Sequence, residues 1–157
     1  MAKTLSRSLL ALAWVLPISL MAQSVPLTQD SYVLPGGSGN YGVQQAIDVG
    51  GSNAFQSLVQ FDLSTLPAST TSAKIGRATL VLFAKTVTAA GTINISVANG
   101  SWTESAVNGI NAPTAGSAVA SGVSVTNSGS FVYVDATAAV QAWLHFDHKQ
   151  RVHRHAE

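Results

Sequence analysis

The chain has no cysteine and few charged residues. Without cysteine, the fold must be held by its core rather than by disulfides. Charged side chains make up only 10% of the 157 residues and the net charge is +1, which argues against nucleic acid as the main partner. Residues 25–144 also contain no histidine, so Ser–His and Cys–His nucleophile pairs are excluded there.

Within residues 25–144 the charged side chains are sparse and mostly acidic. There are three cations, Lys74, Arg77 and Lys85. There are five anions, Asp30, Asp48, Asp62, Glu104 and Asp135. Paired carboxylates for glycoside hydrolysis remain open among these five, but their spacing nominates no pair. The surplus positive charge of the chain therefore lies in its two ends.

The first of those ends has the build of a targeting segment. Basic residues precede an apolar run at residues 9–20, and small residues follow at Ala22 and Ser24. This order predicts a secretory signal peptide at residues 1–24. The run is too short for a membrane span of about 20 apolar residues, and Pro17 interrupts it. An N-terminal anchor helix is the alternative. We expect a secreted or cell-surface protein of bacterial type, with no membrane segment after cleavage.

Residues 55–85 contain two strand-like runs joined by a polar connection with Pro67. A period of two puts alternate residues of a strand on opposite faces. One face of the second run carries Ala78, Leu80, Leu82 and Ala84. The other face carries Arg77, Thr79, Val81, Phe83 and Lys85. In the first run Val59, Phe61 and Leu63 alternate with polar residues in the same way. The aliphatic faces predict a β core.

The rest of the chain reads as short strands and turns. Strands are expected at residues 29–33, 46–49, 92–97, 119–125 and 130–134, with a loop at residues 100–116. Such short strands at close spacing predict an all-β sandwich or barrel. One short helix is expected at residues 136–144, begun by Asp135 and closing one end of the sandwich with Trp143. Residues 145–157 are polar and contain the four histidines, which predicts a disordered tail.

Several segments resemble the DNRLRE-type domain, a carbohydrate-binding module of secreted bacterial polysaccharide lyases and surface proteins. The similar segments are Gln29-Asp30-Ser31-Tyr32-Val33, Asn40-Tyr41-Gly42, Phe61-Asp62-Leu63-Ser64-Thr65-Leu66-Pro67, Ala78-Thr79-Leu80-Val81-Leu82, Trp102-Thr103-Glu104-Ser105, Asn111-Ala112-Pro113, Asp135-Ala136-Thr137 and Val140-Gln141-Ala142-Trp143-Leu144. No single motif is specific, but their order over residues 25–144 carries the resemblance. It implies a jelly-roll β-sandwich.

The chain departs from that family in three places. Phe55, Gln56 and Gln60 stand where the family places arginines, and residues 107–110 lack an expected aromatic. Both changes weaken a carried-over preference for acidic sugars such as alginate. After Leu144 the family continues through further strands, whereas this chain ends in a polar segment. We expect a truncated sandwich, whose unpaired strand edges favour self-association.

The residues suited to sugar binding are aromatic or cationic. Trp102, Tyr41 and Tyr133 offer flat rings for stacking on a pyranose. Arg77 and Lys85 share one strand face and can meet uronate carboxylates. The alternatives are core packing for the rings and a solvated strand face for the cations.

The carboxylates have simpler expected roles. Asp62 and Asp135 are expected to cap turns, because carboxylates within apolar strands need partners. No cofactor is required, although Asp30 is a candidate ligand for a structural calcium ion. The histidines of the tail can bind metal adventitiously.

The sequence therefore predicts a secreted, non-catalytic module whose partner is a polysaccharide, with acidic chains among the candidates. The alternative is a structural or adhesive β-sandwich of a larger surface protein, without a sugar site. An enzyme ranks third.

Overall fold

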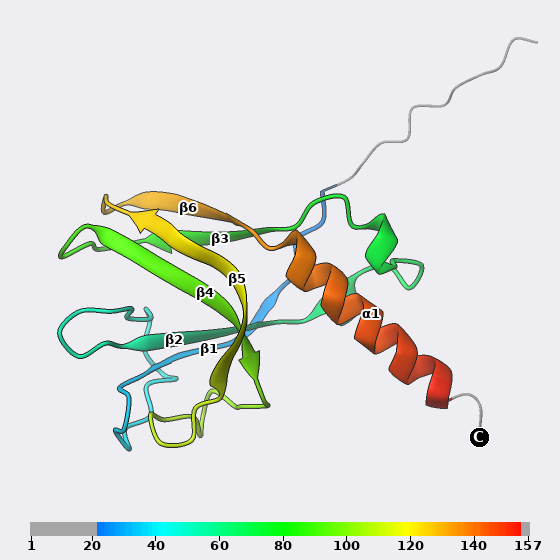
Figure 1. Cartoon of the computed structure of the whole chain (residues 1–157). Coiled ribbons are helices and arrows are strands. Elements are labelled where there is room, and N and C mark those ends of the chain that lie inside the picture. The colour runs from blue at the N-terminus through cyan, green and yellow to red at the C-terminus, as the bar shows by residue number, and fades with distance from the viewer. Residues whose placement is uncertain (1–21, 155–157) are drawn as a thin grey trace, which may run out of the picture.

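The computed structural model describes residues 22–154, with side chains described as far as His145. The described chain forms an antiparallel β-sandwich with one helix near its C-terminal end (Figure 1). The elements in chain order are β1 (Leu27–Val33), β2 (Gln56–Phe61), β3 (Thr79–Ala84), β4 (Gly91–Asn99), β5 (Thr114–Val125), β6 (Ser130–Asp135) and α1 (Thr137–Arg154). The fold class predicted from the alternating strands is thus confirmed.

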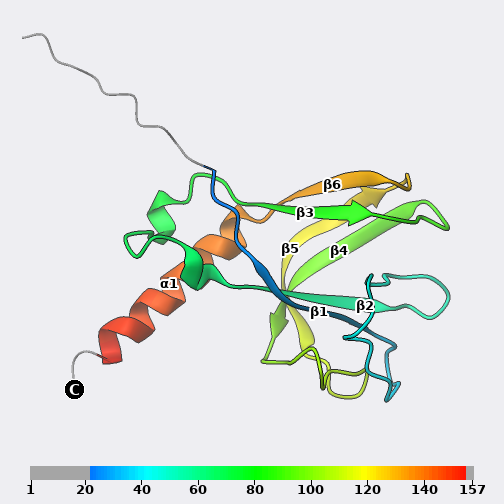
Figure 2. The same ribbon diagram turned by 180° about the vertical axis from the view of Figure 1, so that it is seen from behind.

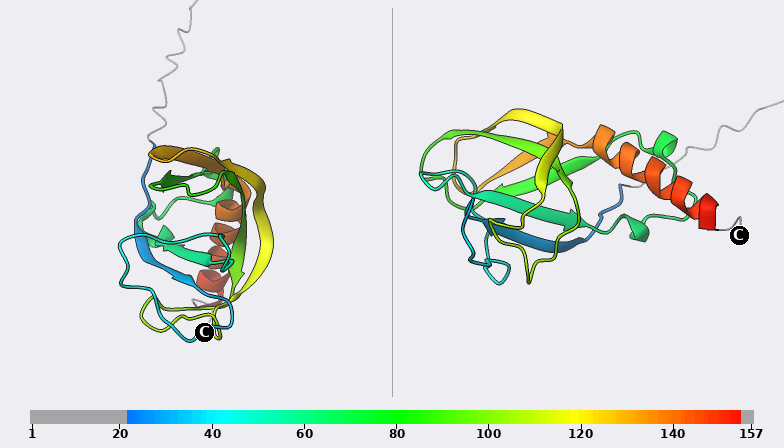
Figure 3. Two further views of the ribbon diagram at one scale, coloured as in Figure 1. Left: turned by 90° about the vertical axis from the view of Figure 1, so that its left-hand side faces the viewer. Right: turned by 60° about the horizontal axis from the view of Figure 1, so that its bottom comes forward.

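The strands form three antiparallel pairs, β1–β2, β3–β6 and β4–β5. The β4–β5 hairpin lies inside the β3–β6 pair in sequence, so residues 79–135 fold over as one long nested hairpin. Nested hairpins of this kind build jelly-roll sandwiches. Seen along the strands, the three pairs surround a common interior (Figure 3). In the view from behind, β3–β6 is at the top, β4–β5 is below it, and β1–β2 is the lowest pair (Figure 2).

The core follows from the period of two within each strand. In β3 the odd-numbered residues are exposed and the even-numbered ones turn inward. Its partner β6 buries Val134, which is 3% exposed, and β1 buries Val33 and Ser31. Val107 comes from the loop between β4 and β5 and is also buried. The two runs of residues 55–85 become β2 and β3, which belong to different pairs.

The connection between β2 and β3 is made of two short 3-10 helices, Leu63–Thr65 and Ser72–Lys74. Asp62 ends β2 because its Oδ1 accepts a hydrogen bond from the backbone amide of Ser64 at 2.9 Å. Leu63, expected to continue the strand, therefore lies in the first turn of this connection.

The largest differences from the predicted strands are at residues 46–49 and at the start of β5. No strand forms at residues 46–49, so that prediction is wrong. Gly50 and Gly51 adopt left-handed backbone angles there, and the segment instead closes a tight turn through an isolated bridge between Gly50 and Phe55. Strand β5 begins at Thr114, earlier than predicted, because residues 114–118 pair with the far end of β4.

Helix α1 contains the predicted helix but is longer. It runs from Thr137 to Arg154, past the position where a disordered tail is predicted. Residues 145–154 contain neither Gly nor Pro, so nothing in their backbone chemistry ends the helix. Residues 155–157 of the predicted tail lie outside the described residues.

Trp143 does not close the sandwich as predicted. It is 40% exposed, whereas Ala139 in the first turns of the helix is buried. Figure 1 shows the reason, since α1 leaves the strands after its first turns and extends away from them. The side-chain amide of Gln141 donates to the carbonyl of Ile75 at 2.8 Å and fixes the helix against the β2–β3 connection.

The N-terminal segment is only partly described. Residues 1–21 of the predicted signal peptide lie outside the described residues. Among the described residues, no helix combines the length and the apolar character needed to span a membrane.

Candidate functional site

The outer face of the β3–β6 pair carries four exposed apolar side chains. Their exposed fractions are 49% for Val81, 55% for Phe83, 59% for Phe131 and 66% for Tyr133. The register explains their proximity, since Phe83 lies opposite Phe131 and Val81 lies opposite Tyr133. We call these four residues the apolar strip. A contiguous group of exposed apolar side chains on a protein surface often marks a binding site.

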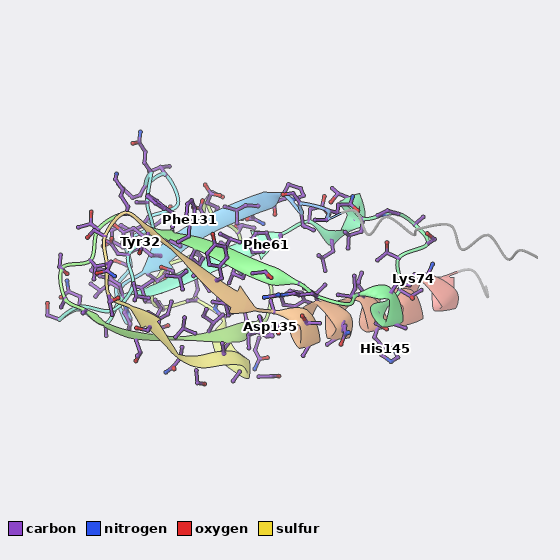
Figure 4. The ribbon with its side chains drawn as sticks, turned by 90° about the horizontal axis from the view of Figure 1, so that it is seen from above. Tyr32, Phe61, Lys74, Phe131, Asp135 and His145 are labelled. Carbon is purple, nitrogen blue, oxygen red and sulfur yellow. The ribbon has the colours of Figure 1, made fainter. Side chains whose placement is uncertain are left out.

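The rings of the apolar strip lie close together but are not parallel. The centroids of Phe83 and Phe131 are 5.1 Å apart, with 54° between the ring planes. The centroids of Phe131 and Tyr133 are 6.3 Å apart, with 40° between the planes. Neither pair is a parallel stack, so each ring keeps part of its face open to solvent. Figure 4 looks onto this pair from above, with Phe131 near one end of β6 and Asp135 near the other.

Polar and charged residues continue the strip at both ends. Lys85 follows β3 next to Phe83 in the alternation, and Arg77 precedes β3 at the other end. Thr79 and Asp135 form the last cross-strand pair before Arg77. Hydrogen bonds from the Thr137 side chain and backbone, with a smaller effect of the Arg77 charge, hold the pKa of Asp135 below its usual range. The structure therefore places Tyr133 on this face, with Arg77 and Lys85 flanking the two ends of β3.

A second group of family-motif residues joins two loops at a different place. The side-chain amide of Asn40 donates to the carbonyls of Glu104 and Val107, both at 2.7 Å. The carboxylate of Glu104 accepts a hydrogen bond from the backbone amide of Asp30 at 3.2 Å. The backbone amide of Glu104 donates to Gln29 Oε1 at 2.8 Å. We call this set the loop junction. It ties loops 34–55 and 100–113 to β1.

Glycine is required inside the loop junction because the backbones touch. A Cβ added at Gly42 would overlap the carbonyl of Glu104 and lie 2.6 Å from its Cγ. A Cβ added at Gly109 would overlap the carbonyl of Leu34. The motifs that carry the family resemblance in these loops thus make contacts that hold the loops together.

Tyr41 and Trp102 lie with these loops, apart from the strip. Tyr41 stacks on Tyr32 with ring centroids 4.5 Å apart and planes 14° apart, and Phe55 meets both rings edge-on. Burial raises the pKa of Tyr32, and Asp48 and Tyr41 add to the effect. Trp102 is half-buried next to the loop junction. One face of the Tyr41 ring is therefore already occupied by a protein ring.

Sequence reasoning missed Phe83 and Phe131 as candidate site residues. Phe83 already shared the face of Arg77 and Lys85 in the alternation, which was a signal for an exposed ring. Phe131 carried no such signal, because its position beside Phe83 depends on the pairing of β3 with β6. The two rings become a site only through that register.

Asp30, the predicted calcium ligand, does not belong to a cluster of metal-binding side chains among the described residues. In the described part of the chain, no group of three or more His, Cys, Asp and Glu side chains gathers in a geometry that could hold a metal ion. Asp30 is half-buried in β1, where its backbone amide donates to Glu104. Calcium at Asp30 stays a prediction.

An all-β sandwich that exposes aromatic rings on one sheet face has the build of a ligand-binding domain. The comparison with protein families identifies which kind. The chain belongs to carbohydrate-binding module family 96, whose family model matches residues 21–152. No curated protein matches the chain. The match supports the carbohydrate-binding part of the sequence resemblance and leaves the DNRLRE-type name and the truncation untested.

Proposed function

We propose that this chain is a secreted, non-catalytic module that binds polysaccharide through the apolar strip of β3 and β6. The observation that carries the proposal is the exposure of Phe83, Phe131 and Tyr133 side by side in a chain of carbohydrate-binding module family 96. Secretion rests on the predicted signal peptide at residues 1–24.

The chemistry of the strip suits a sugar chain. A pyranose has an apolar face of C–H groups that packs on an aromatic ring, and hydroxyls at its rim that hydrogen-bond to polar side chains. Phe131 and Tyr133 supply the rings. Thr79 and Lys85, exposed at the two ends of β3, supply hydroxyl and ammonium groups. Lys85 and Arg77 also favour chains that carry carboxylates, which is why acidic polysaccharides belong among the candidates.

The roles of the carboxylates support a non-catalytic module. Asp62 and Asp135 each accept a backbone amide at a turn, and Glu104 accepts the amide of Asp30. Carboxylates that act in glycoside hydrolysis face one another across the substrate. These three instead stabilise loops and strand ends.

Affinity electrophoresis in gels containing a panel of soluble polysaccharides, alginate included, tests the proposal. We expect at least one polysaccharide to retard the wild-type domain, and Tyr133→Ala to lose most of that retardation. Trp102→Ala is the matched control, because it removes an aromatic ring away from the strip. Absence of retardation by every polysaccharide, for a domain that melts cooperatively, would refute the proposal.

The same strip also favours a second candidate function, because an exposed apolar sheet face can pack against protein. In a structural or adhesive module the strip would join the domain to its neighbours. Sedimentation velocity separates the two readings. The structural module would be supported by two results together: the wild-type domain forms an assembly that Tyr133→Ala dissociates, and it has no affinity for any polysaccharide.

A further inference from the structure

We propose that the apolar strip takes a single, twisted polysaccharide chain lying along β3 and β6, and not the flat surface of a crystalline polysaccharide. The inference rests on the proposed function and specifies the physical form of its ligand. It follows from the angles between the rings, the width of the strand pair and the arrangement of polar groups along it.

The ring planes do not form a flat platform. They differ by 54° between Phe83 and Phe131 and by 40° between Phe131 and Tyr133. A flat ligand surface parallel to the Phe131 ring would meet the other two rings obliquely and lose most of their contact area. The right-handed twist between neighbouring strands, about 20–25°, accounts for part of these angles, and the side-chain rotamers account for the rest. A free chain can follow them, because its sugar rings turn relative to one another about the glycosidic bonds.

The strip is also narrow. The β3–β6 pair is hydrogen-bonded as a two-stranded sheet, so its backbone is only about 5 Å wide in the hydrogen-bonding direction, although β5 contacts β6 beside it. From Thr79 to Ala84 the pair extends over about 17 Å at the usual rise per strand residue. A surface much longer than it is wide matches one sugar chain along the strands. A crystalline face offers many parallel chains, of which this strip could contact only one.

The polar groups lie where a chain along the strands would meet them. Lys85 is at one end of the strip, and Thr79, Asp135 and Arg77 are at the other. Between them lie the four residues of the apolar strip, whose only polar side-chain atom is the Tyr133 hydroxyl oxygen. Hydroxyls of a chain running along β3 would therefore find hydrogen-bonding partners at its two ends, with ring stacking between them.

The test compares soluble chains with crystalline particles. Affinity electrophoresis uses hydroxyethyl cellulose, glucomannan, xylan and alginate, and pull-down uses microcrystalline cellulose and crystalline chitin. The variants are Phe131→Ala and Tyr133→Ala in the strip, and Trp102→Ala next to the loop junction. Val43→Ala is the matched control, because Val43 is 87% exposed in a loop away from the strip. Thermal melting of each variant checks that it is folded.

We expect retardation by at least one soluble chain, with affinity about tenfold weaker in each strip variant and unchanged in Val43→Ala. Neither crystalline material should retain the wild-type domain. Retention on crystalline material that depends on Phe131 would overturn the inference and leave the proposed function standing. Binding of soluble chains that is lost in Trp102→Ala and kept in Phe131→Ala would also overturn the inference. If the wild-type domain is a dimer that Phe131→Ala dissociates, the strip binds a second copy of the chain and the inference is overturned. Absence of binding to every glycan would overturn the proposed function itself.

Discussion

The substitution Gly109→Ala tests whether the loop junction holds this sandwich together. A Cβ at Gly109 would overlap the carbonyl oxygen of Leu34, and would lie 2.7 Å from the Leu34 carbonyl carbon and 2.9 Å from the Gly36 nitrogen. All three atoms belong to backbone, which cannot rotate away as a side-chain tip can. The same contact contains a hydrogen bond from the amide of Gly36 to the carbonyl of Gly109 at 3.0 Å. The methyl group fits only if the two loops separate.

The expected loss combines two effects. Overpacking against fixed atoms destabilises by about 1–3 kcal/mol, and weakening one backbone hydrogen bond adds about 1 kcal/mol. We therefore expect the free energy of unfolding of Gly109→Ala to fall by about 2–4 kcal/mol. For a domain of this size the melting temperature should drop by roughly 6–20 °C.

Thermal and urea unfolding measure this effect against a matched control. Gly76→Ala adds the same methyl group where no atom lies within 4 Å, and Gly76 has no left-handed backbone angle. Its free energy of unfolding should change by less than about 1 kcal/mol, and can rise because alanine restricts the unfolded chain. If Gly109→Ala melts within about 2 °C of Gly76→Ala, the close contact of loops 34–37 and 107–110 does not stabilise the fold and the reasoning fails.

Three further predictions concern stability. Glu104→Ala should lower the free energy of unfolding by about 1–2 kcal/mol in urea titrations because it removes an acceptor, whereas Glu104→Gln, which keeps an oxygen acceptor, should lower it less. Hydrogen bonds from Ser64 hold the pKa of Asp62 below its usual range, as Thr137 does for Asp135. The folded state therefore binds protons less readily than the unfolded state. The stabilisation from both carboxylates is complete above about pH 4 and is lost as the pH falls further. Between pH 7 and pH 2, the melting temperatures of Asp62→Asn and Asp135→Asn should therefore fall less steeply than that of the wild-type domain. Tyr41→Ala should lower the melting temperature by removing the Tyr32 stack and leave polysaccharide retardation unchanged.

The strands with a clear period of two were predictable from the sequence. In β3 and β4 the apolar residues alternate with polar or exposed ones over the whole element, and the structure buries them accordingly. The period survives in these strands because each has one face toward the interior and one toward water. The turns that bound them were also predictable, since Pro67 and the Gly50-Gly51 pair mark positions where a ladder cannot continue.

Elements fixed by distant contacts were not predictable. Residues 46–49 have an apolar pattern too short to choose a partner, and no strand forms there. The first residues of β5 have no strong strand propensity, yet they pair with β4 through an irregular register. Trp143 has the helical spacing of a buried residue, but the helix has already left the sandwich at that turn. In each case tertiary placement overrides the local pattern.

The apolar strip shows the same limit at the level of function. Phe83 and Phe131 are far apart in the sequence, and only the nested pairing of β3 with β6 brings their rings to 5.1 Å. A slip of β6 by one residue against β3 would turn Phe131 and Tyr133 inward and Val134 outward. Val134 is 3% exposed, so such a slip would expose a core residue and bury the Tyr133 hydroxyl without a partner. The register that completes the core is therefore the same register that exposes the strip, and a variant that shifts this register must disturb both.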